Sequence, residues 1–256
     1  MIASSLFHFT DFESLKTIFV SGYLRASFNF ERVNDLGKDF RYCAIPMVCF
    51  CDIPLRFVSK DHINQYGSYG LAFKKQWAIN NGIQPLTYRI EGSGISKTTA
   101  ELIESVKSSG MTLDQLYKEE LELSGSQSVL KLISTTSKIN RLIFDSYAFS
   151  KPYGRNGEFY REREWRYKAE YPLEFFQEYY ESDRNEINEV YHQDMEDMSK
   201  YLNFKIADIE HVIIEKREDL DELVSHIDST LSQMSSLDRY RLIQKVSDLE
   251  TIQRDV

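Results

Sequence analysis

The hydrophobic and polar positions of the chain follow two different periods, and each period predicts a different kind of element. Short runs that are apolar or that alternate predict strands. They lie at residues 5–9, 46–50, 71–73, 86–90, 162–171 and 209–215. The run at 46–50 is apolar throughout, which is typical of a central strand buried on both faces. Residues 25–45 and 60–70 follow neither period, and we interpret both as loops.

Apolar residues three and four positions apart predict helices between and after these strands. They lie at about 11–21, 99–148, 173–202 and 217–256, with a short helix or turn at 74–81. The first helix has the clearest ends. Thr10 and Glu13 have the spacing of a capping box, and Gly22 follows the last turn.

Strands and helices mixed in this order indicate an α+β fold. We expect one core domain over residues 1–216, with a helical insertion at about 99–150, and a C-terminal helical hairpin over residues 217–256. Apolar residues from Leu220 to Met234 are spaced by four and three, a heptad-like stripe. Such a stripe serves either a dimer or packing on the protein's own core.

Composition and charge narrow the class of protein. The 256 residues carry a formal net charge of −9, which argues against a broad surface for duplex nucleic acid, because such a surface is basic. No stretch approaches the ~18 consecutive apolar residues of a membrane span, and the N-terminus lacks the pattern of a signal peptide. Three cysteines, an odd number, fit a reducing compartment. We therefore expect a cytoplasmic protein without a membrane partner.

The cysteines do not predict a metal site. Cys49 and Cys51 form a C-x-C pair and Cys43 lies six residues earlier, whereas zinc sites usually combine two pairs at C-x₂₋₄-C spacing. The sequence offers no second pair. Small buried hydrophobic side chains are the favoured role, and no metal is expected.

Two segments in the first third of the chain offer groups that could contact a ligand. His8 lies on the first predicted strand, where strand gives way to helix, so it either bonds a neighbouring carbonyl or faces a cleft. Tyr66 and Tyr69 flank a glycine in the segment YGSYG. They form either an ordinary tyrosine-rich turn or a flat surface for a nicotinamide or nucleobase.

The segment EREWRY, at residues 162–167, is the most unusual of the chain. Strand alternation would place Glu162, Glu164 and Arg166 on one face and the two aromatic residues on the other. Carboxylates beside a guanidinium have shifted pKa values. A carboxylate beside a ribose can stabilise an oxocarbenium-like transition state or take a proton. The alternative is a solvated edge strand with cross-strand ion pairs.

Taken in order, four segments resemble the AbiGi family of abortive-infection, or phage-resistance, proteins. They are LFHFTD (6–11), PMVCFCDIPL (46–55), YGSYGLAFKKQW (66–77) and FYREREWRY (159–167). The resemblance runs from about residue 5 to about residue 215. AbiGi proteins are also described as antitoxin-like partners, which implies a co-encoded defence or toxin–antitoxin protein and a binding role without catalysis.

The opening of the chain is in addition similar to that of the DarT-like ADP-ribosyltransferases, on its H-x-T motif and the helix that ends at Gly22. This second resemblance implies a mixed β core that uses NAD as a substrate and transfers ADP-ribose to a nucleic-acid or protein acceptor. It also implies that His8 and Thr10 hold the adenosine side or the nicotinamide ribose. Arg25 and Arg32 are the candidates for pyrophosphate contacts.

The same resemblance implies roles for the later segments. Tyr69, or Tyr66, would stack on the nicotinamide. Glu164 would stabilise the ribosyl cation, and Glu162 with Glu164 looks like the E-x-E of arginine-modifying members. Two tyrosines compete for one role and two glutamates for another, and the insertion at 99–150 separates them by more chain than compact members use.

Overall fold

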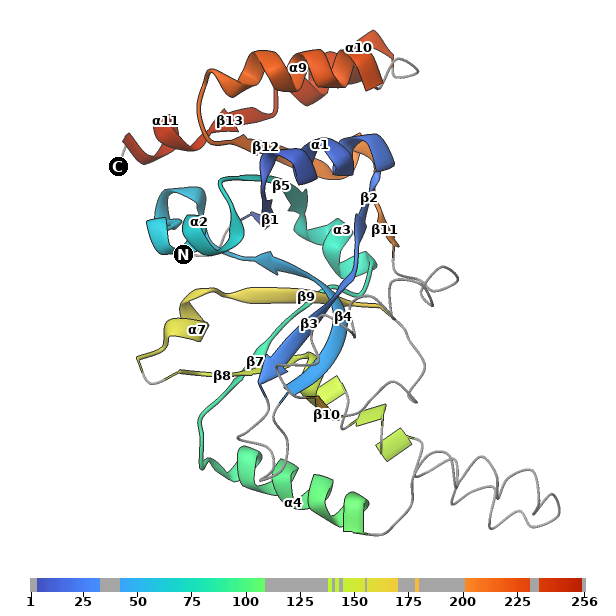
Figure 1. Cartoon of the computed structure of the whole chain (residues 1–256), viewed down its shortest axis with the longest axis vertical. Helices are drawn as coiled ribbons and strands as arrows, with labels where there is room; N and C mark the ends of the chain where they lie inside the picture. Colours follow the sequence, from blue (N-terminus) through green and yellow to red (C-terminus); the bar gives the residue numbers. More distant parts are fainter. Residues whose placement is uncertain are drawn as a thin grey trace, which may run out of the picture.

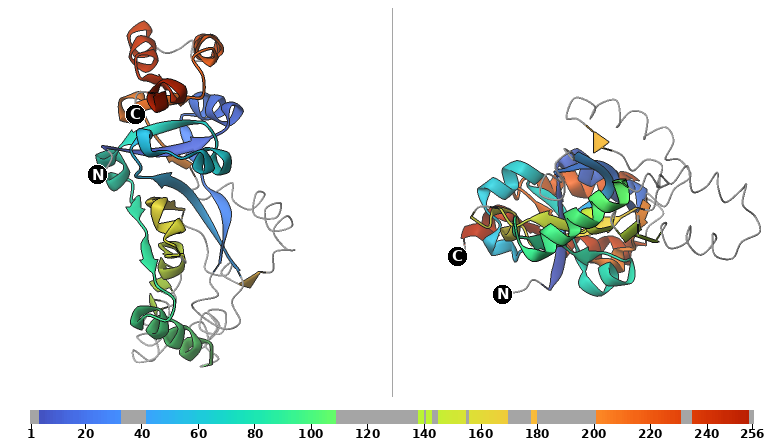
Figure 2. Two further views of the ribbon diagram at one scale, coloured as in Figure 1. Left: turned by 90° about the vertical axis from the view of Figure 1, so that its left-hand side faces the viewer. Right: turned by 90° about the horizontal axis from the view of Figure 1, so that it is seen from below.

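The computed structural model describes residues 4–32, 42–108, 138–139, 141–142, 145–154, 156–169, 178–179, 201–230 and 235–254. Within this part the molecule is elongated, with two C-terminal helices at one end and a long helix of the insertion at the other (Figure 1 and Figure 2). A mixed sheet runs between the two ends. The predicted α+β class is therefore confirmed.

Nine strands of the described residues form this sheet. Along its main path lie β13 (Val246–Asp248), β12 (Ile209–Ile214), β5 (Tyr69–Lys74), β1 (Ser5–Thr10), β4 (Tyr42–Cys51), β9 (Glu164–Lys168) and β6 (Gln84–Pro85). Off this path, β3 (Ser27–Arg32) and β10 (Glu178–Tyr179) pair with β4. The pairings are antiparallel, except that β13 lies parallel to β12.

Two small sheets lie beside the large one. The first joins β2 (Tyr23–Arg25) to β11 (Tyr201–Asn203) in antiparallel register. The second joins β7 (Thr87–Arg89) to β8 (Ser150–Pro152) in parallel register. The second sheet pairs β8, which follows the insertion, with β7. Leu86, directly before β7, donates its N–H to the Glu164 carbonyl, so this small sheet lies beside β9.

Helices cover both faces of the sheet around β1, β5 and β12. One face carries α1 (Phe12–Ser21), α3 (Lys75–Asn80), α9 (Asp219–Thr230) and α10 (Ser236–Ile243). The opposite face carries the 3-10 helix η1 (Leu55–Phe57), α2 (Lys60–Tyr66) and α11 (Leu249–Arg254). Farther along the chain lie α4 (Gly94–Ser108), α7 (Glu158–Arg161) and the 3-10 helix η5 (Ile206–Asp208).

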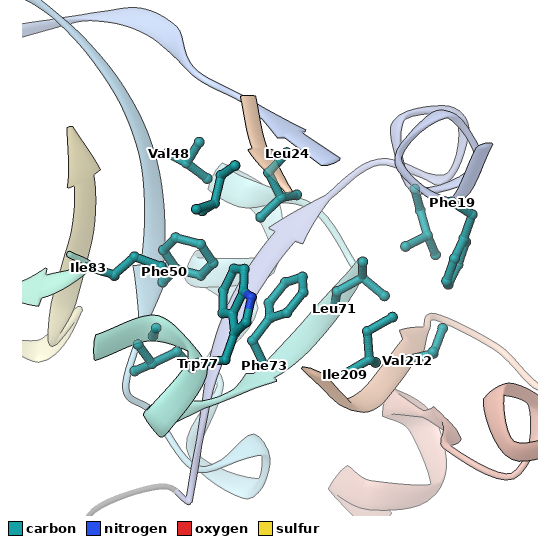
Figure 3. Close-up of a cluster of buried hydrophobic side chains, with 14 of the residues drawn as sticks. Phe19, Leu24, Val48, Phe50, Leu71, Phe73, Trp77, Ile83, Ile209 and Val212 are labelled. Carbon is teal, nitrogen blue, oxygen red and sulfur yellow. The ribbon is translucent and has the colours of Figure 1, made fainter. Parts of the chain in front are cut away.

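The larger core cluster lies on the α1 face (Figure 3). Phe73 stacks on Trp77 with ring centroids 4.5 Å apart, and Phe50 meets both rings edge-on at 6.1 and 6.4 Å. These geometries are the favoured ones for aromatic pairs. The cluster therefore ties β4, β5 and α3 together, and α9 adds Leu223 and Ile227 to it.

Most of the predicted elements are present. Strands are found at each of the six predicted runs, and the first helix ends at Gly22, whose φ of 70° is the left-handed cap expected there. The predicted capping role of Thr10 is wrong. Asp11 is the N-cap, because its carboxylate accepts the N–H of Ser14 at 2.8 Å, and Thr10 is still part of β1.

Both predicted loops are wrong. Residues 25–45 contain β3 and the start of β4, because Phe28 and Phe30 alternate with polar residues and β3 pairs with β4 along its whole length. Residues 60–66 form α2, which Ser59 caps by accepting the His62 N–H. The helix was hidden because Ile63 is its only aliphatic side chain.

The remaining helical predictions are met in part. The insertion begins with α4 at Gly94, and most of residues 109–144 lie outside the described part. Where residues 173–202 are described, they are strands and not the predicted helix. The tail forms a pair of helices as predicted, α9 and α10, but α10 ends at Ile243, and residues 246–248 form β13, which pairs with β12 and is followed by α11. Among the described helices none is both long and apolar enough to cross a membrane.

Candidate functional site

A fork in the sheet opens where β1 and β4 separate. β1 pairs with β5 at six positions but with β4 only at Phe7, opposite Cys51. Farther along the same edge of β4, β3 takes over and pairs up to Met47. Among the described strands, therefore, none pairs with residues 48–50 on this edge, and we call this gap the β1–β4 fork.

His8 spans the fork. Continuing the register would set the backbone of Phe9 opposite Cys49, but the strands have diverged, and the His8 Nδ1–H donates to the Cys49 carbonyl over 2.9 Å instead. The imidazole thus supplies the hydrogen bond that a neighbouring strand would have made. The interpretation of His8 as a histidine bonded to a backbone carbonyl is confirmed.

The same bond leaves Nε2 as the acceptor of the His8 ring, since a neutral imidazole carries one proton. Burial lowers the pKa of His8 below its usual value of 6.5, and the Cys49 carbonyl only partly opposes this. His8 is therefore a neutral side chain at pH 7, able to accept a hydrogen bond from a hydroxyl.

A cavity of about 340 Å³ occupies the β1–β4 fork. Its walls come from β1, β2, β3, β4, α2 and the segments around Lys151 and Glu162, and we call it the fork pocket. The side chains that carry chemistry in it are His8, Tyr66, Lys151, Glu162 and Glu164. Cavities of this size and mixed polarity are common ligand sites.

An ion network forms the floor of the fork pocket. Glu164 binds Arg166 through Oε1 (2.5 Å to Nε) and Lys151 through Oε2 (3.0 Å to Nζ). Lys151 also binds Glu162 Oε2 at 2.7 Å, and Arg166 Nη2 binds Glu31 Oε1 at 2.6 Å. Two cations are thus held by three carboxylates.

The network shifts the pKa values of its members. Burial by itself raises the pKa of Glu164, but Arg166 and Lys151 outweigh it and lower that pKa to about 2. Burial lowers the pKa of Lys151, and the surrounding carboxylates more than reverse this, so its pKa is raised. For Glu31 burial wins over Arg166, and the pKa of this carboxyl is raised. Glu164 is therefore permanently ionised at neutral pH.

The structure brings five of the predicted site residues to one cavity. They are His8, Arg25, Tyr66, Glu162 and Glu164. Glu162 reaches it from the end of α7 and not from the predicted strand, because Arg163, with a φ of 45°, turns the chain before β9 begins. Glu164 and Arg166 share a face of β9, as alternation predicted.

Tyr69 does not line the fork pocket. Its ring stacks on Phe12 at 4.8 Å, and its hydroxyl donates to Asp219 over 2.9 Å. Of the two competing tyrosines, only Tyr66 lies in the pocket. Burial, followed by Asp219, raises the pKa of Tyr69, so its hydroxyl stays protonated and remains the donor in this bond.

Two further predicted site residues, Thr10 and Arg32, each end a strand of the sheet. Thr10 ends β1 opposite Tyr69 and is not among the residues that line the fork pocket. Its carbonyl lies against Gly67, where an added Cβ would be 2.0 Å from the oxygen. Arg32 ends β3, and its side chain is outside the part that the structure describes.

Neither Lys151 nor Glu31 was predicted as a site residue. Lys151 follows the insertion on a three-residue strand, and Glu31 lies in the segment interpreted as a loop. The alternation of Phe28 and Phe30 would have placed Glu31 on a strand face. For Lys151, only the folded sheet brings the ammonium group to the glutamates.

The cysteines do not form a metal site within the described residues, where no group of three His, Cys, Asp or Glu side chains is arranged to hold a metal ion. Cys49 and Cys51 are free thiols, and Cys51 is buried. Burial, followed by the charge of Glu164, raises the pKa of Cys49 well above its usual value. The Cys49 side chain is therefore a neutral thiol, and not a thiolate, in the wall of the fork pocket.

Comparison with known proteins identifies relatives of this chain. The family model described as abortive phage resistance protein AbiGi, antitoxin, matches residues 25–215. The abortive phage resistance protein AbiGi of Lactococcus lactis subsp. cremoris is 25% identical over 219 residues, which cover 82% of this chain and 87% of that protein. No solved structure matches.

Proposed function

The chain belongs to the AbiGi family of abortive phage resistance proteins, and on this premise we propose that it is an ADP-ribosyltransferase that uses NAD in phage defence. One observation carries the proposal. A single cavity gathers a neutral histidine, a tyrosine and two glutamates from four separate elements. These are the residue types, in the chain order, that the DarT-like resemblance implies for the nicotinamide end of NAD.

The geometry supports a distinct role for each group. The Nε2 of His8 would accept a hydrogen bond from a ribose hydroxyl, because Nδ1 is held by the Cys49 carbonyl. Tyr66 would offer its ring to the nicotinamide. Glu164, ionised at any pH well above 2, would place a fixed negative charge beside the ribose.

The reaction that these groups would assist is a displacement at the ribose. The bond between the ribose carbon and the nicotinamide nitrogen breaks, and nicotinamide leaves with the bonding electrons. The acceptor nucleophile forms the new bond to the same ribose carbon and releases its proton to water. A carboxylate stabilises the positive charge that develops on the ribose, so removal of the Glu164 charge should lower the rate.

Arg25 is the candidate for the pyrophosphate. It lies at the end of β2, is exposed and lines the fork pocket. A guanidinium suits phosphate oxygens because it presents paired donors. Lys151, the other cation that lines the pocket, belongs to the ion network with Glu162 and Glu164.

A second function, that of an antitoxin, has its own support. The matched family is described as an antitoxin, and Lys151 occupies one oxygen each of Glu162 and Glu164. In this function the ion network stabilises the fork pocket, and no NAD is turned over there. The chain binds a co-encoded toxin instead.

Release of nicotinamide from NAD by the purified protein distinguishes the two functions. The transferase predicts release that falls at least about a hundredfold in Glu164→Gln, as expected when one charge-stabilising group is removed. Glu210→Gln is the matched control, because Glu210 lies on β12, outside the fork pocket, and its carboxylate pairs with Lys74 at 3.8 Å with both side chains partly exposed. Equal rates in wild type and Glu164→Gln would contradict the transferase.

A further inference from the structure

A second, larger cavity of about 790 Å³ adjoins the fork pocket. It lies between residues 53–66, which include η1 and α2, and residues 158–163, which include α7, and we call it the α2–α7 groove. Three side chains line both cavities: His62, Tyr66 and Glu162. The two cavities therefore meet at this junction.

The junction presents hydrogen-bond acceptors. Burial lowers the pKa of His62, so its ring is neutral at pH 7, and its Nε2 is buried without a hydrogen-bond partner among the described residues. The ring is fixed between Phe9, at 5.1 Å, and Tyr66, at 4.7 Å. A neutral ring carries one proton, and in the tautomer with that proton on Nδ1 the buried Nε2 would accept from a ligand N–H and recover the free energy that an unpartnered buried nitrogen costs.

Glu162 and Tyr66 add further acceptor oxygens. Only one oxygen of Glu162 is held by Lys151, at 2.7 Å, and a carboxylate accepts through both. The Tyr66 hydroxyl oxygen accepts a bond from Gln65 at 2.9 Å and has a second lone pair. A side chain that carries several N–H donors and a positive charge fits these acceptors best.

The rest of the groove is aromatic, with a slight excess of acidic groups. Phe57 is 55% exposed, with Arg56 over its ring at 4.7 Å, and Tyr160 is 47% exposed, with its ring stacked on Tyr153, so both rings are partly open to solvent in its walls. Its charged residues are Asp61, Arg161, Arg163, Glu158 and Glu162. Three acids thus face two bases in a chain of net charge −9. A nucleic-acid strand, with one phosphate per nucleotide, would meet no excess of cations here.

We propose that the α2–α7 groove binds a segment of a partner protein that inserts a lysine or arginine side chain at the His62–Tyr66–Glu162 junction. The exposed parts of the Phe57 and Tyr160 rings contact apolar side chains beside the basic one. The site does not depend on NAD. In a transferase it receives the acceptor protein, and in an antitoxin it receives the toxin.

Proton NMR of the histidine rings tests this site directly. The chain has five histidines, so the His62 ring resonance can be assigned from a His62→Gln variant. The probes are the peptides acetyl-Leu-Arg-Leu-amide and acetyl-Leu-Lys-Leu-amide. Their matched control carries citrulline, which keeps the shape of arginine without its charge. The oligonucleotide dT4 tests for a nucleic-acid site.

Either basic peptide should shift the His62 resonance saturably, with an affinity about tenfold higher than the citrulline peptide, a difference of about 1.4 kcal/mol. Glu162→Gln should remove that preference, and Glu210→Gln should keep it. Equal binding of the citrulline peptide, no shift of His62 with either basic peptide, or tighter binding of dT4 would each overturn the proposal. The peptides are titrated without NAD, so the two proposals fail separately.

Discussion

Arg166 Nε lies 2.5 Å from Glu164 Oε1, and the two side chains share one face of β9 beneath the fork pocket. The same guanidinium donates to the Ala148 carbonyl at 2.9 Å and to Glu31 at 2.6 Å. Arg166 is only 1% exposed, so it is a buried cation held by partners from three parts of the chain. The ion network of the candidate site thus also holds three parts of the chain together.

Removing Glu164 should destabilise the protein. Glu164→Ala leaves Arg166 buried without its closest carboxylate, a change that typically costs about 3–5 kcal/mol. Urea unfolding should show this loss, and Glu164→Gln should lose less because an amide oxygen still accepts. Glu210→Ala on the surface of β12 should stay within about 0.5 kcal/mol of wild type. A Glu164→Ala protein as stable as wild type would show that the network contributes little.

Stability should fall in acid through Glu164. Its pKa in the folded protein is lowered to about 2 from a usual 4.5. Its contribution is therefore complete above about pH 4.5 and is lost as the pH falls toward 2. The raised pKa of Glu31 has the opposite sign and acts at higher pH. Urea midpoints measured from pH 5 to pH 2 should fall more steeply for wild type than for Glu164→Gln, and equal slopes would contradict the assignment.

Gly67 should tolerate no side chain. Its φ is 102°, and an added Cβ would lie 2.0 Å from the Thr10 carbonyl oxygen. Gly67→Ala should therefore lose more than the ~1–3 kcal/mol that backbone strain alone costs. Gly82 has a φ of 73° with no heavy atom within 4 Å of an added Cβ, so Gly82→Ala measures the strain alone. Thermal unfolding of the pair should rank Gly67→Ala as the less stable, and the reverse order would count against the packing at α2.

The two tyrosines should differ in their effect on NAD binding. Tyr66 lines the fork pocket, whereas Tyr69 bonds Asp219 on the other side of the sheet. Tyr66→Ala should weaken NAD binding by about tenfold or more, since stacking on an aromatic ring contributes about 1–3 kcal/mol. Tyr69→Phe should leave NAD binding unchanged. Calorimetric titration measures both, and a loss confined to Tyr69→Phe would reassign the site.

The sequence was most informative where contacts are local or a strand is wholly apolar. The buried strand at 46–50 and the strand at 209–215 follow from composition, and Glu164 beside Arg166 follows from alternation. In the same way, Gly22 marks the end of α1.

What could not be predicted depends on contacts between distant segments. Lys151 reaches Glu162 and Glu164 only because β8 returns beside β9 after the insertion. The choice of Tyr66 over Tyr69 required α2, a helix whose single aliphatic residue, Ile63, gives no period to detect. The β1–β4 fork has no signature in the sequence, because the residue pattern of a strand does not show where its pairing with a neighbouring strand stops.

A titration of purified protein with NAD, followed by thermal unfolding, tests the central claim most directly. A ligand that binds only the folded state raises stability, by about 2.7 kcal/mol at a hundred times its Kd. We predict a rise in Tm with NAD for wild type and for Tyr69→Phe, and none for His8→Ala, whose starting Tm is lower because the bond across the β1–β4 fork is lost. An unchanged Tm for wild type at about 10 mM NAD would contradict NAD binding in the fork pocket.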